Sequence, residues 1–168
     1  MARKEKCAIF DIDNTIFDAR ERFYLVIKRF GVRSPRELPL ELQREFWKEF
    51  INPHMFHLDR PISRTIEMVL DAKRRGLKVV LVTGRYESVR RETELQLRMA
   101  GIPFDKLIMR PDNNFQRDKE LKPFLLREVD CEPVEYHDDD PETLTEIKKM
   151  YPNAIYFLHR PDGTFSII

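Results

Sequence analysis

The sequence has few cysteines, no long hydrophobic run and almost no net charge, and each of these deficits excludes a class of protein. Its 168 residues include two cysteines, Cys7 and Cys131, and neither belongs to a CxxC or Cys/His spacing. We therefore expect reduced thiols in a cytosolic protein rather than a disulfide framework. Thirty Lys and Arg residues against 29 Asp and Glu residues leave a formal charge of +1, so overall charge gives no reason to expect strong nucleic-acid binding.

The amino-terminal stretch also lacks a targeting pattern. Residues 1–6 carry charges and are not followed by an apolar segment long enough for a signal peptide or a membrane span. We expect a soluble cytoplasmic protein with no membrane association and no obligate protein partner. The length fits a single domain, 1–168, which is large enough to bury a core without disulfides.

Short apolar runs alternate along the chain with stretches of helical periodicity. The runs are Cys7–Phe10, Val79–Val82, Leu107–Met109, Val134–Tyr136 and Ala154–Leu158. Helices are predicted at about 62–73, 87–100, 119–129 and 141–151, with a short final strand within 162–168. Near-continuous apolar strands followed by helices predict an α/β fold, a doubly wound and mostly parallel sheet covered on both faces.

One segment interrupts this alternation. Two further helical patterns, at about 20–30 and 40–50, lie between Asp18 and Pro61 and are joined by a stretch with two prolines. We interpret 19–60 as a small helical insertion, or cap, that follows the first strand. Trp47 and its phenylalanine neighbours are interpreted as the core of this cap rather than as a surface on which bases stack.

Polar side chains follow each predicted strand, at the edge where open parallel sheets bind ligands. Asp11 and Asp13 are spaced by two residues, so they project to the same face and repel each other. Later strands are followed by Thr83-Gly84-Arg85, by a segment with Lys119 and Lys122, and by Asp138-Asp139-Asp140.

Two acidic clusters would therefore meet at one edge of the sheet and require a cation. Carboxylate oxygens without nitrogen or sulfur ligands favour Mg²⁺, which can also bridge to a phosphate. Zinc is disfavoured because the four histidines, His54, His57, His137 and His159, form no ligand spacing. Lys122 or Lys119 would assist, with Lys122 the favoured choice.

These residues resemble the four motifs of the haloacid-dehalogenase-like (HAD) phosphohydrolase superfamily. Asp11-Ile12-Asp13-Asn14-Thr15 is similar to the first motif, DxDx[TV], and the apolar strand ending at Thr83 is similar to the second. Lys122 before Pro123 resembles the third motif, and Asp138-Asp139 resembles the fourth in its adjacent-acid form. The motifs occur in order, and the resemblance spans the chain from Cys7 to about Leu158.

The resemblance implies a Mg²⁺-dependent phosphatase that forms an aspartyl-phosphate on Asp11. Asp13 would act as general acid and then base, with its main-chain carbonyl reaching the metal. Thr83 would donate a hydrogen bond to a phosphoryl oxygen, and Lys122 would balance negative charge. The implied metal set is Asp11, Asp13, Asp138 and Asp139. The expected substrate contacts are Thr83, Gly84 and Arg85.

A narrower resemblance bears on the substrate. The stretch from Thr83-Gly84-Arg85 through Gly101–Asp105, Ile108–Pro111 and Arg117-Asp118 to Lys122 is similar to the phosphatase half of phage-type polynucleotide kinases, which removes 3′-phosphates from nucleic-acid ends. Nothing matches the GxxxxGK[ST] loop of a kinase half. The expected substrate is thus a nucleic-acid 3′ end or a nucleotide, with a phosphorylated small molecule such as a sugar phosphate as the alternative.

Two other classes remain as alternatives. A signalling receiver domain also uses an acidic cluster, a Thr and a Lys on a parallel sheet, but it carries its acid pair on the first strand. Here the pair, Asp138 and Asp139, comes last. The remaining alternative is a catalytically silent binding module, which the intact set of motifs disfavours.

Overall fold

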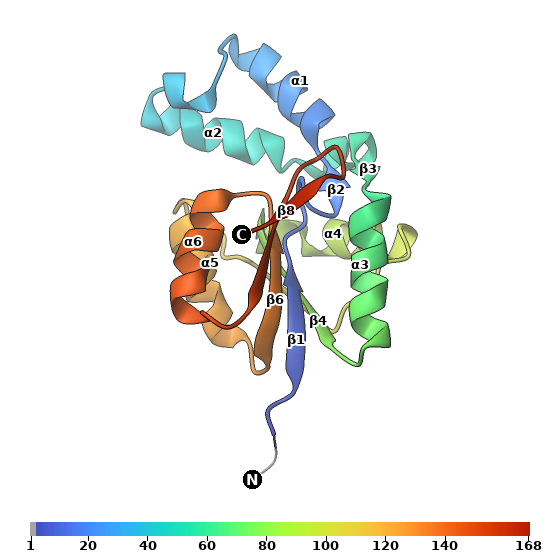
Figure 1. Cartoon of the computed structure of the whole chain (residues 1–168). Coiled ribbons are helices and arrows are strands. Elements are labelled where there is room, and N and C mark those ends of the chain that lie inside the picture. Colours follow the sequence, from blue (N-terminus) through green and yellow to red (C-terminus); the bar gives the residue numbers. More distant parts are fainter. Residues whose placement is uncertain (1–2) are drawn as a thin grey trace.

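Six strands form one mixed sheet in this computed structural model, which describes residues 3–168 (Figure 1). In spatial order they are β5 (Lys106–Arg110), β4 (Lys78–Tyr86), β1 (Lys6–Phe10), β6 (Glu132–Asp138), β7 (Ile155–His159) and β8 (Phe165–Ile167). Every neighbouring pair is parallel except β7 and β8. This confirms the doubly wound, mostly parallel sheet. Met1 and Ala2, where the charged amino-terminal stretch begins, lie outside the described residues.

Helices cover both faces of the sheet (Figure 1). α5 (Asp118–Leu125) and α6 (Pro141–Met150) pack on one face, and α3 (Ser63–Arg74) and α4 (Arg90–Met99) pack on the other. Side chains of β1 alternate between the two cores, with Ile9 on the α5–α6 side and Phe10 on the α3–α4 side. Short 3₁₀ turns, η3 (Glu87–Val89) and η4 (Leu126–Glu128), flank α4 and α5, so these α-helices are shorter than predicted.

The segment between β1 and α3 contains two antiparallel helices above the sheet (Figure 1). They are α1 (Arg20–Phe30) and α2 (Leu40–Phe50). A short 3₁₀ turn, η1 (Pro35–Glu37), lies between them, and a second, η2 (Pro53–Leu58), follows α2. Their shared core includes Phe46 and Phe50, and the Trp47 ring packs edge-on against both, with centroids 5.1 and 5.6 Å away. The phenylalanines thus form the core of this segment as expected, whereas Trp47 is 40% exposed and lies at its surface.

A two-stranded ribbon closes the base of this segment. β2 (Phe17–Asp18) pairs antiparallel with β3 (Arg60–Pro61), so the chain leaves and re-enters the core at the same place. The sequence did not predict this ribbon, because two residues are too few to show an alternating pattern. The ribbon fixes both ends of the helical segment next to the carboxyl end of β1.

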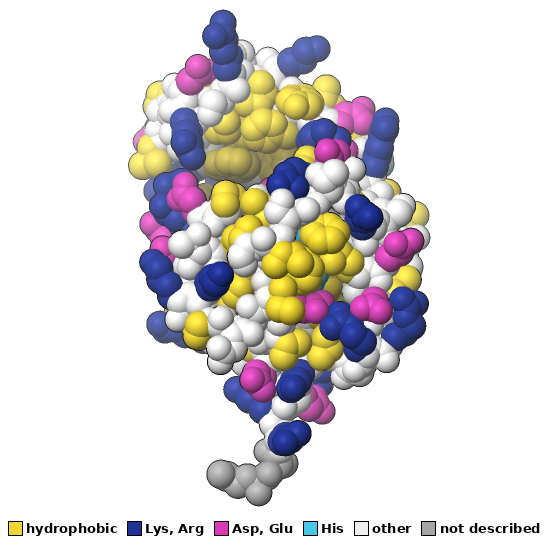
Figure 2. Space-filling model, in the orientation of Figure 1, with side chains coloured by type: hydrophobic (Ala, Val, Ile, Leu, Met, Phe, Trp, Pro, Cys, Tyr) yellow, Lys and Arg dark blue, Asp and Glu magenta, His cyan; other side chains and the backbone are white. Residues whose placement is uncertain are grey.

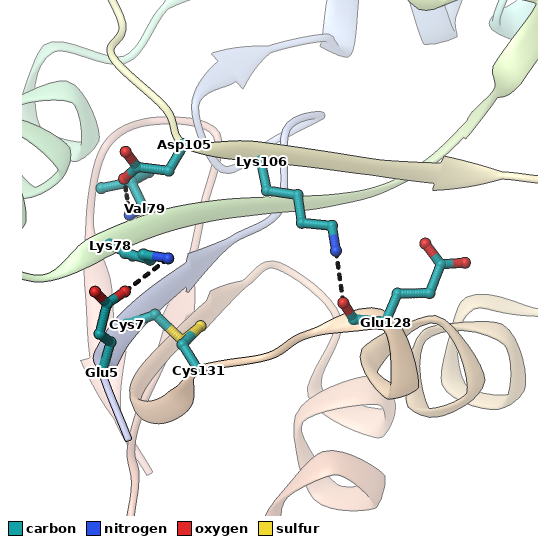
Figure 3. The surroundings of a disulfide bond; sticks show 8 residues. All are labelled: Glu5, Cys7, Lys78, Val79, Asp105, Lys106, Glu128 and Cys131. Atoms are coloured by element: carbon teal, nitrogen blue, oxygen red, sulfur yellow. Dashed lines mark hydrogen bonds and ion pairs between the residues drawn. A yellow bond between two sulfur atoms is a disulfide. The ribbon is translucent and has the colours of Figure 1, made fainter. Parts of the chain in front are cut away.

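The two cysteines form a disulfide, which corrects the expectation of reduced thiols (Figure 3). Cys7 lies on β1 and Cys131 directly precedes β6, and their Cα atoms are 5.8 Å apart. The sequence hid this proximity, because the two cysteines are 124 residues apart in the chain and meet only where β1 pairs with β6. The argument from cysteine usage to a cytosolic compartment therefore loses its basis.

Removing this disulfide is expected to lower the free energy of unfolding by about 2–4 kcal/mol, because it closes a long loop in the unfolded chain. For a domain of this size, about 1 kcal/mol corresponds to a shift in Tm of about 2–4 °C. The Cys7→Ala/Cys131→Ala variant should therefore melt roughly 5–15 °C below the wild type in a calorimetric scan. A reductant should lower the wild-type Tm only; an unchanged Tm in the double variant would contradict this prediction.

Part of the exposed hydrophobic surface lies near the β8 edge of the sheet. Figure 2 shows hydrophobic side chains gathered in the middle of the face that Figure 1 presents. Ile155 and Ile167, on β7 and β8, are 50% and 64% exposed. Within residues 3–168, no helix has the length and apolar character needed to cross a membrane.

Candidate active site

Three carboxylates meet at the carboxyl ends of β1 and β6. Asp11 follows β1, Asp138 ends β6 and Asp139 comes next, and one oxygen from each lies within 4.8 Å of the others. The main-chain N–H of Asp11 donates to the carbonyl of His137 at 2.9 Å, which ties the two strand ends together. The structure thus brings together acidic residues from opposite ends of the sequence, as expected.

Lys122 on α5 lies between two of these carboxylates. Its Nζ is 3.0 Å from Asp11 Oδ1 and 2.6 Å from Asp138 Oδ2, and its side chain is fully buried. Burial alone would lower the pKa of Lys122, but the adjacent carboxylates raise it well above its usual value, so the amine is charged. Lys119 instead pairs with Glu142 at 2.8 Å and is partly exposed. The geometry therefore favours Lys122 over Lys119.

This cluster carries more negative than positive charge. Burial raises the pKa of Asp11 to about 7, with Asp138 adding to the rise and Lys122 opposing it. Burial also raises the pKa of Asp138 and, more strongly, that of Asp139. Buried carboxylates stay ionised only when cations or hydrogen-bond donors compensate them. A set of carboxylate oxygens short of positive charge fits a hard dication such as Mg²⁺.

The side chain of Asp13 points away from this cluster, into a pair of arginines. Arg22 Nη2 lies 2.5 Å from Asp13 Oδ1, while Arg85 donates from Nη2 to Oδ1 at 2.7 Å and from Nε to Oδ2 at 3.1 Å. Burial would raise the pKa of Asp13, but the two guanidinium groups hold it well below its usual value. Metal contact through the main-chain carbonyl of Asp13 stays a prediction.

Arg22 and Asp59, which sequence reasoning missed, complete this network from the helical segment. Arg22 donates to both carboxylate oxygens of Asp59 at 3.0 Å, and Arg85 Nη2 lies 3.3 Å from Asp59. Two buried arginines thus balance two aspartates. The sequence places Arg22 one helical turn before Val26, and this spacing could have indicated that the two residues share one face of the helix. In the structure, they are the two buried residues of α1.

Thr83, Gly84 and Arg85 lie in β4 rather than in a loop after it. β4 continues to Tyr86, and its register with β5 shifts between Thr83 and Tyr86. Thr83 is buried, and its Oγ1 accepts a hydrogen bond from the Arg85 N–H at 3.1 Å, which leaves the hydroxyl hydrogen free to donate. Arg85 contacts Asp13, and its expected contact with the substrate stays a prediction.

Gly84 is needed because another carboxylate approaches it closely. A Cβ at this position would lie 2.7 Å from Asp118 Oδ1. Arg110 holds Asp118 there through Nη2 at 2.7 Å and bonds the Gly84 carbonyl through Nε, also at 2.7 Å. Asp118 in turn lies 3.6 Å from Lys122. Sequence reasoning assigned no role to Asp118, because its approach depends on Arg110 and on the missing side chain of Gly84.

Comparison with protein families supports these motif assignments. The family model described as HAD superfamily, subfamily IIIB (Acid phosphatase), matches residues 1–123 of this chain. The matched region includes the first three motifs and ends directly after Lys122. A comparison with curated proteins finds no match.

Solved structures show the same fold. The chain is similar to one in the Pnkp1/Rnl/Hen1 RNA repair complex, with a TM-score of 0.69 and 22% identity over 92% of this chain and 42% of that chain. It therefore spans less than half the length of that protein. It is also similar to a HAD-superfamily hydrolase from Ehrlichia chaffeensis, with a TM-score of 0.57 and 16% identity over 96% of this chain and 91% of that one.

A further similar structure is the class C acid phosphatase from Bacillus anthracis with tungstate bound. Its TM-score is 0.58 at 14% identity, over 97% of this chain and 69% of that chain. At these identities the structural similarities establish the fold, whereas the family assignment rests on the matched sequence model.

Proposed function

The chain belongs to the HAD superfamily, subfamily IIIB, a family of phosphatases, and on this premise we propose that it is a Mg²⁺-dependent phosphomonoesterase acting through an aspartyl-phosphate on Asp11. The observation that carries the proposal is the position of Lys122, fully buried between Asp11 and Asp138. A charged lysine at this point keeps a carboxylate nucleophile ionised and attracts a phosphate group.

Asp11, Asp138 and Asp139 would hold the ion, together with the predicted main-chain carbonyl of Asp13. When bound, Mg²⁺ would neutralise the carboxylates and stabilise the negative charge of the transferring phosphoryl group. The oxygens of Asp11 and Asp138 that do not face Lys122 also accept hydrogen bonds, since Thr15 Oγ1 donates to Asp11 Oδ2 at 3.3 Å and the Asp140 N–H donates to Asp138 Oδ1 at 3.0 Å. These bonds orient the two carboxylates.

The reaction would proceed in two steps. A carboxylate oxygen of Asp11 attacks phosphorus, and the bond to the leaving alcohol oxygen breaks. Water then attacks the phosphorus of the aspartyl-phosphate, which releases inorganic phosphate and restores Asp11. Lys122 orients Asp11 in both steps, and the free hydroxyl hydrogen of Thr83 donates to a phosphoryl oxygen.

Acid catalysis by Asp13 requires a rearrangement. With both Arg22 and Arg85 bonded to it, Asp13 is ionised and has no proton to give to the leaving oxygen. We propose that one guanidinium turns from Asp13 to the phosphate of the substrate, which raises the pKa of Asp13 and allows proton transfer. Arg22 belongs to α1, so a turn of its guanidinium toward the substrate would couple substrate entry to the helical segment.

We propose nucleic-acid 3′-phosphates or nucleotides as the substrates. The fold is similar to that of a chain in an RNA repair complex, and basic and aromatic side chains adjoin each other where α2 meets the loop before α5. The guanidinium of Arg44 lies 4.5 Å from the ring centroid of Phe115, Lys48 Nζ lies 5.8 Å from it, and the Phe115 side chain is 38% exposed. Aromatic and basic groups together suit stacked bases and backbone phosphates.

A phosphate-release screen with Mg²⁺ tests both parts of this proposal. Its panel is 3′-phosphorylated DNA and RNA oligonucleotides, nucleotides, sugar phosphates and phosphoamino acids. The highest kcat/KM is expected for the oligonucleotides, and Arg44→Glu should lower it for them but not for a small aryl phosphate. Lys28→Glu, on the exposed face of α1, is the matched control. A preference for sugar phosphates would overturn the substrate class and leave the phosphatase proposal standing.

The affinity of the protein for Mg²⁺ is expected to weaken as the pH falls below about 7. Because the pKa of Asp11 is raised to about 7, a proton competes with the ion for this carboxylate below that pH. Apparent Mg²⁺ affinity, measured by calorimetric titration, should therefore weaken by up to about tenfold for each pH unit below about 7. An affinity that is constant across this range would contradict the assigned ligand.

The same shift has a consequence for the stability of the metal-free protein. The pKa of Asp11 rises from 3.8 to about 7 on folding, so the folded state binds more protons than the unfolded state between these values. The contribution of Asp11 to stability is therefore lost as the pH rises through this window. Compared with the wild type, Asp11→Asn should show a flatter decline of Tm over the same range.

A further inference from the structure

A stack of three rings crosses the sheet one residue before the carboxylates. The imidazole of His137 on β6 lies between the rings of Phe10 on β1 and Phe157 on β7, with centroid distances of 4.0 and 4.3 Å and interplanar angles of 9° and 6°. The three residues are register partners on adjacent parallel strands. We call Phe10, His137 and Phe157 the ring stack.

The ring stack lies on the opposite face of the sheet from the carboxylates. Phe10 packs in the core beneath α3 and α4, whereas Asp11 and Asp138 contact Lys122 of α5 on the other side. Phe10 directly precedes Asp11, and His137 directly precedes Asp138. Any change in the distance between Phe10 and His137 therefore changes the distance between Asp11 and Asp138.

Hydrogen bonds fix the plane of the central ring. The carboxylate of Glu135 can only accept, so His137 Nε2 donates to it at 3.1 Å. His137 Nδ1 then accepts from His159 Nε2 at 2.8 Å, and His159 Nδ1 faces Thr65 Oγ1 at 3.5 Å. Arg75 anchors the far end through Glu135 at 3.1 Å. A phenylalanine in place of His137 would have no such anchor at its edge.

We propose that His137, at the centre of the ring stack, is a positioning residue that sets the separation of Asp11 and Asp138 and thereby the affinity for the dication. The proposal on affinity rests on the proposed function, whereas the positional part does not. His137 acts through the bond from the Asp11 N–H to its own carbonyl and through its covalent neighbour Asp138. The hydrogen bonds of its ring go to Glu135 and His159 and not to the carboxylates of Asp11, Asp138 or Asp139.

Amide hydrogen exchange in the metal-free protein tests the positional part. In His137→Ala, exchange at Asp11 should accelerate by about tenfold more than exchange at Ala8 on the same strand, because the end of β1 opens locally. His137→Phe keeps the stack but loses the hydrogen bonds to Glu135 and His159, so it should change this ratio by less than His137→Ala does. Val69→Ala, a buried change in the same core, should accelerate both amides equally. An unchanged ratio in His137→Ala would overturn the proposal.

Calorimetric titration of the same variants with Mg²⁺ tests the link to affinity. His137→Ala should bind Mg²⁺ about tenfold more weakly than the wild type, as is usual when a group that orients a ligand is removed, and Val69→Ala should bind it normally. Equal weakening in both variants would overturn the link. If the wild type binds no Mg²⁺, the proposed function fails while the exchange result still decides the positional part. Should His137→Ala not fold, Phe157→Leu removes one outer ring and takes its place in both experiments.

Discussion

Asp11→Asn is expected to lower kcat on an aryl phosphate by about 10⁴–10⁶-fold, the range seen when one member of a catalytic group that includes the nucleophile is removed. Asparagine has the same shape as aspartate but offers a neutral amide oxygen, which does not attack phosphorus. It also removes one negative charge from the cluster around Lys122. The variant should fold, because the amide oxygen can still accept from Lys122 while the amide NH2 group can donate to the hydroxyl oxygen of Thr15.

Steady-state phosphate release with saturating Mg²⁺ measures this loss. A trapping experiment adds a direct readout: acid-quenched wild-type enzyme should carry phosphate on Asp11, and the variant should carry none. Asp71→Asn, an exposed change on α3, is the control for handling and expression. If Asp11→Asn keeps full activity with Mg²⁺ present, the assigned nucleophile is wrong.

Lys122→Met is expected to lower both stability and activity, whereas Lys119→Met should leave both close to wild type. Methionine keeps the length of the lysine side chain but leaves two buried carboxylates without their partner. Breaking a buried ion pair from one side costs about 3–5 kcal/mol, and losing a cation beside the transferring phosphate should cost about 10²–10³-fold in kcat. The Lys119 pair with Glu142 lies at the surface and contributes at most about 1 kcal/mol.

Urea unfolding of both variants, with and without Mg²⁺, measures the stability difference. Mg²⁺ should restore part of the stability of Lys122→Met, since the ion supplies positive charge to the same carboxylates. Acidification should also reduce the difference in the free energy of unfolding between Lys122→Met and the wild type, because protonation of the neighbouring carboxylates removes their uncompensated charge. Equal losses in the two lysine variants would contradict the assignment of Lys122.

The sheet could be predicted because its information is local. Each buried strand is a short apolar run, and each helix shows its own periodicity and end signals, so β1, β4, β5, β6, β7 and the following helices were found. The meeting of Asp11 with Asp138 also followed from a general rule, since parallel strands place their carboxyl ends at one edge. The choice of Lys122 rested on the resemblance of Lys122-Pro123 to the third HAD motif, and its place beside Leu121 and Leu125 on the buried face of α5 supports it.

The parts that escaped prediction depend on contacts between distant segments. Cys7 and Cys131 meet only once β1 and β6 are neighbours in the sheet. Arg22 reaches Asp13 only because the β2–β3 ribbon places α1 beside the carboxyl end of β1. No local pattern reports either contact. The sequence shows only that Arg22 lies four residues before Val26, on an otherwise apolar face of the helix predicted at about 20–30.

The central claim is that one hard dication binds among Asp11, Asp138 and Asp139, next to Lys122. Anomalous diffraction from crystals grown with Mn²⁺ in place of Mg²⁺ tests it most directly. The account predicts one strong peak at about 2.0–2.3 Å from carboxylate oxygens of Asp11 and Asp138, and its loss in crystals of Asp138→Asn. A protein that is active with Mn²⁺ but shows no peak at these oxygens would contradict the account.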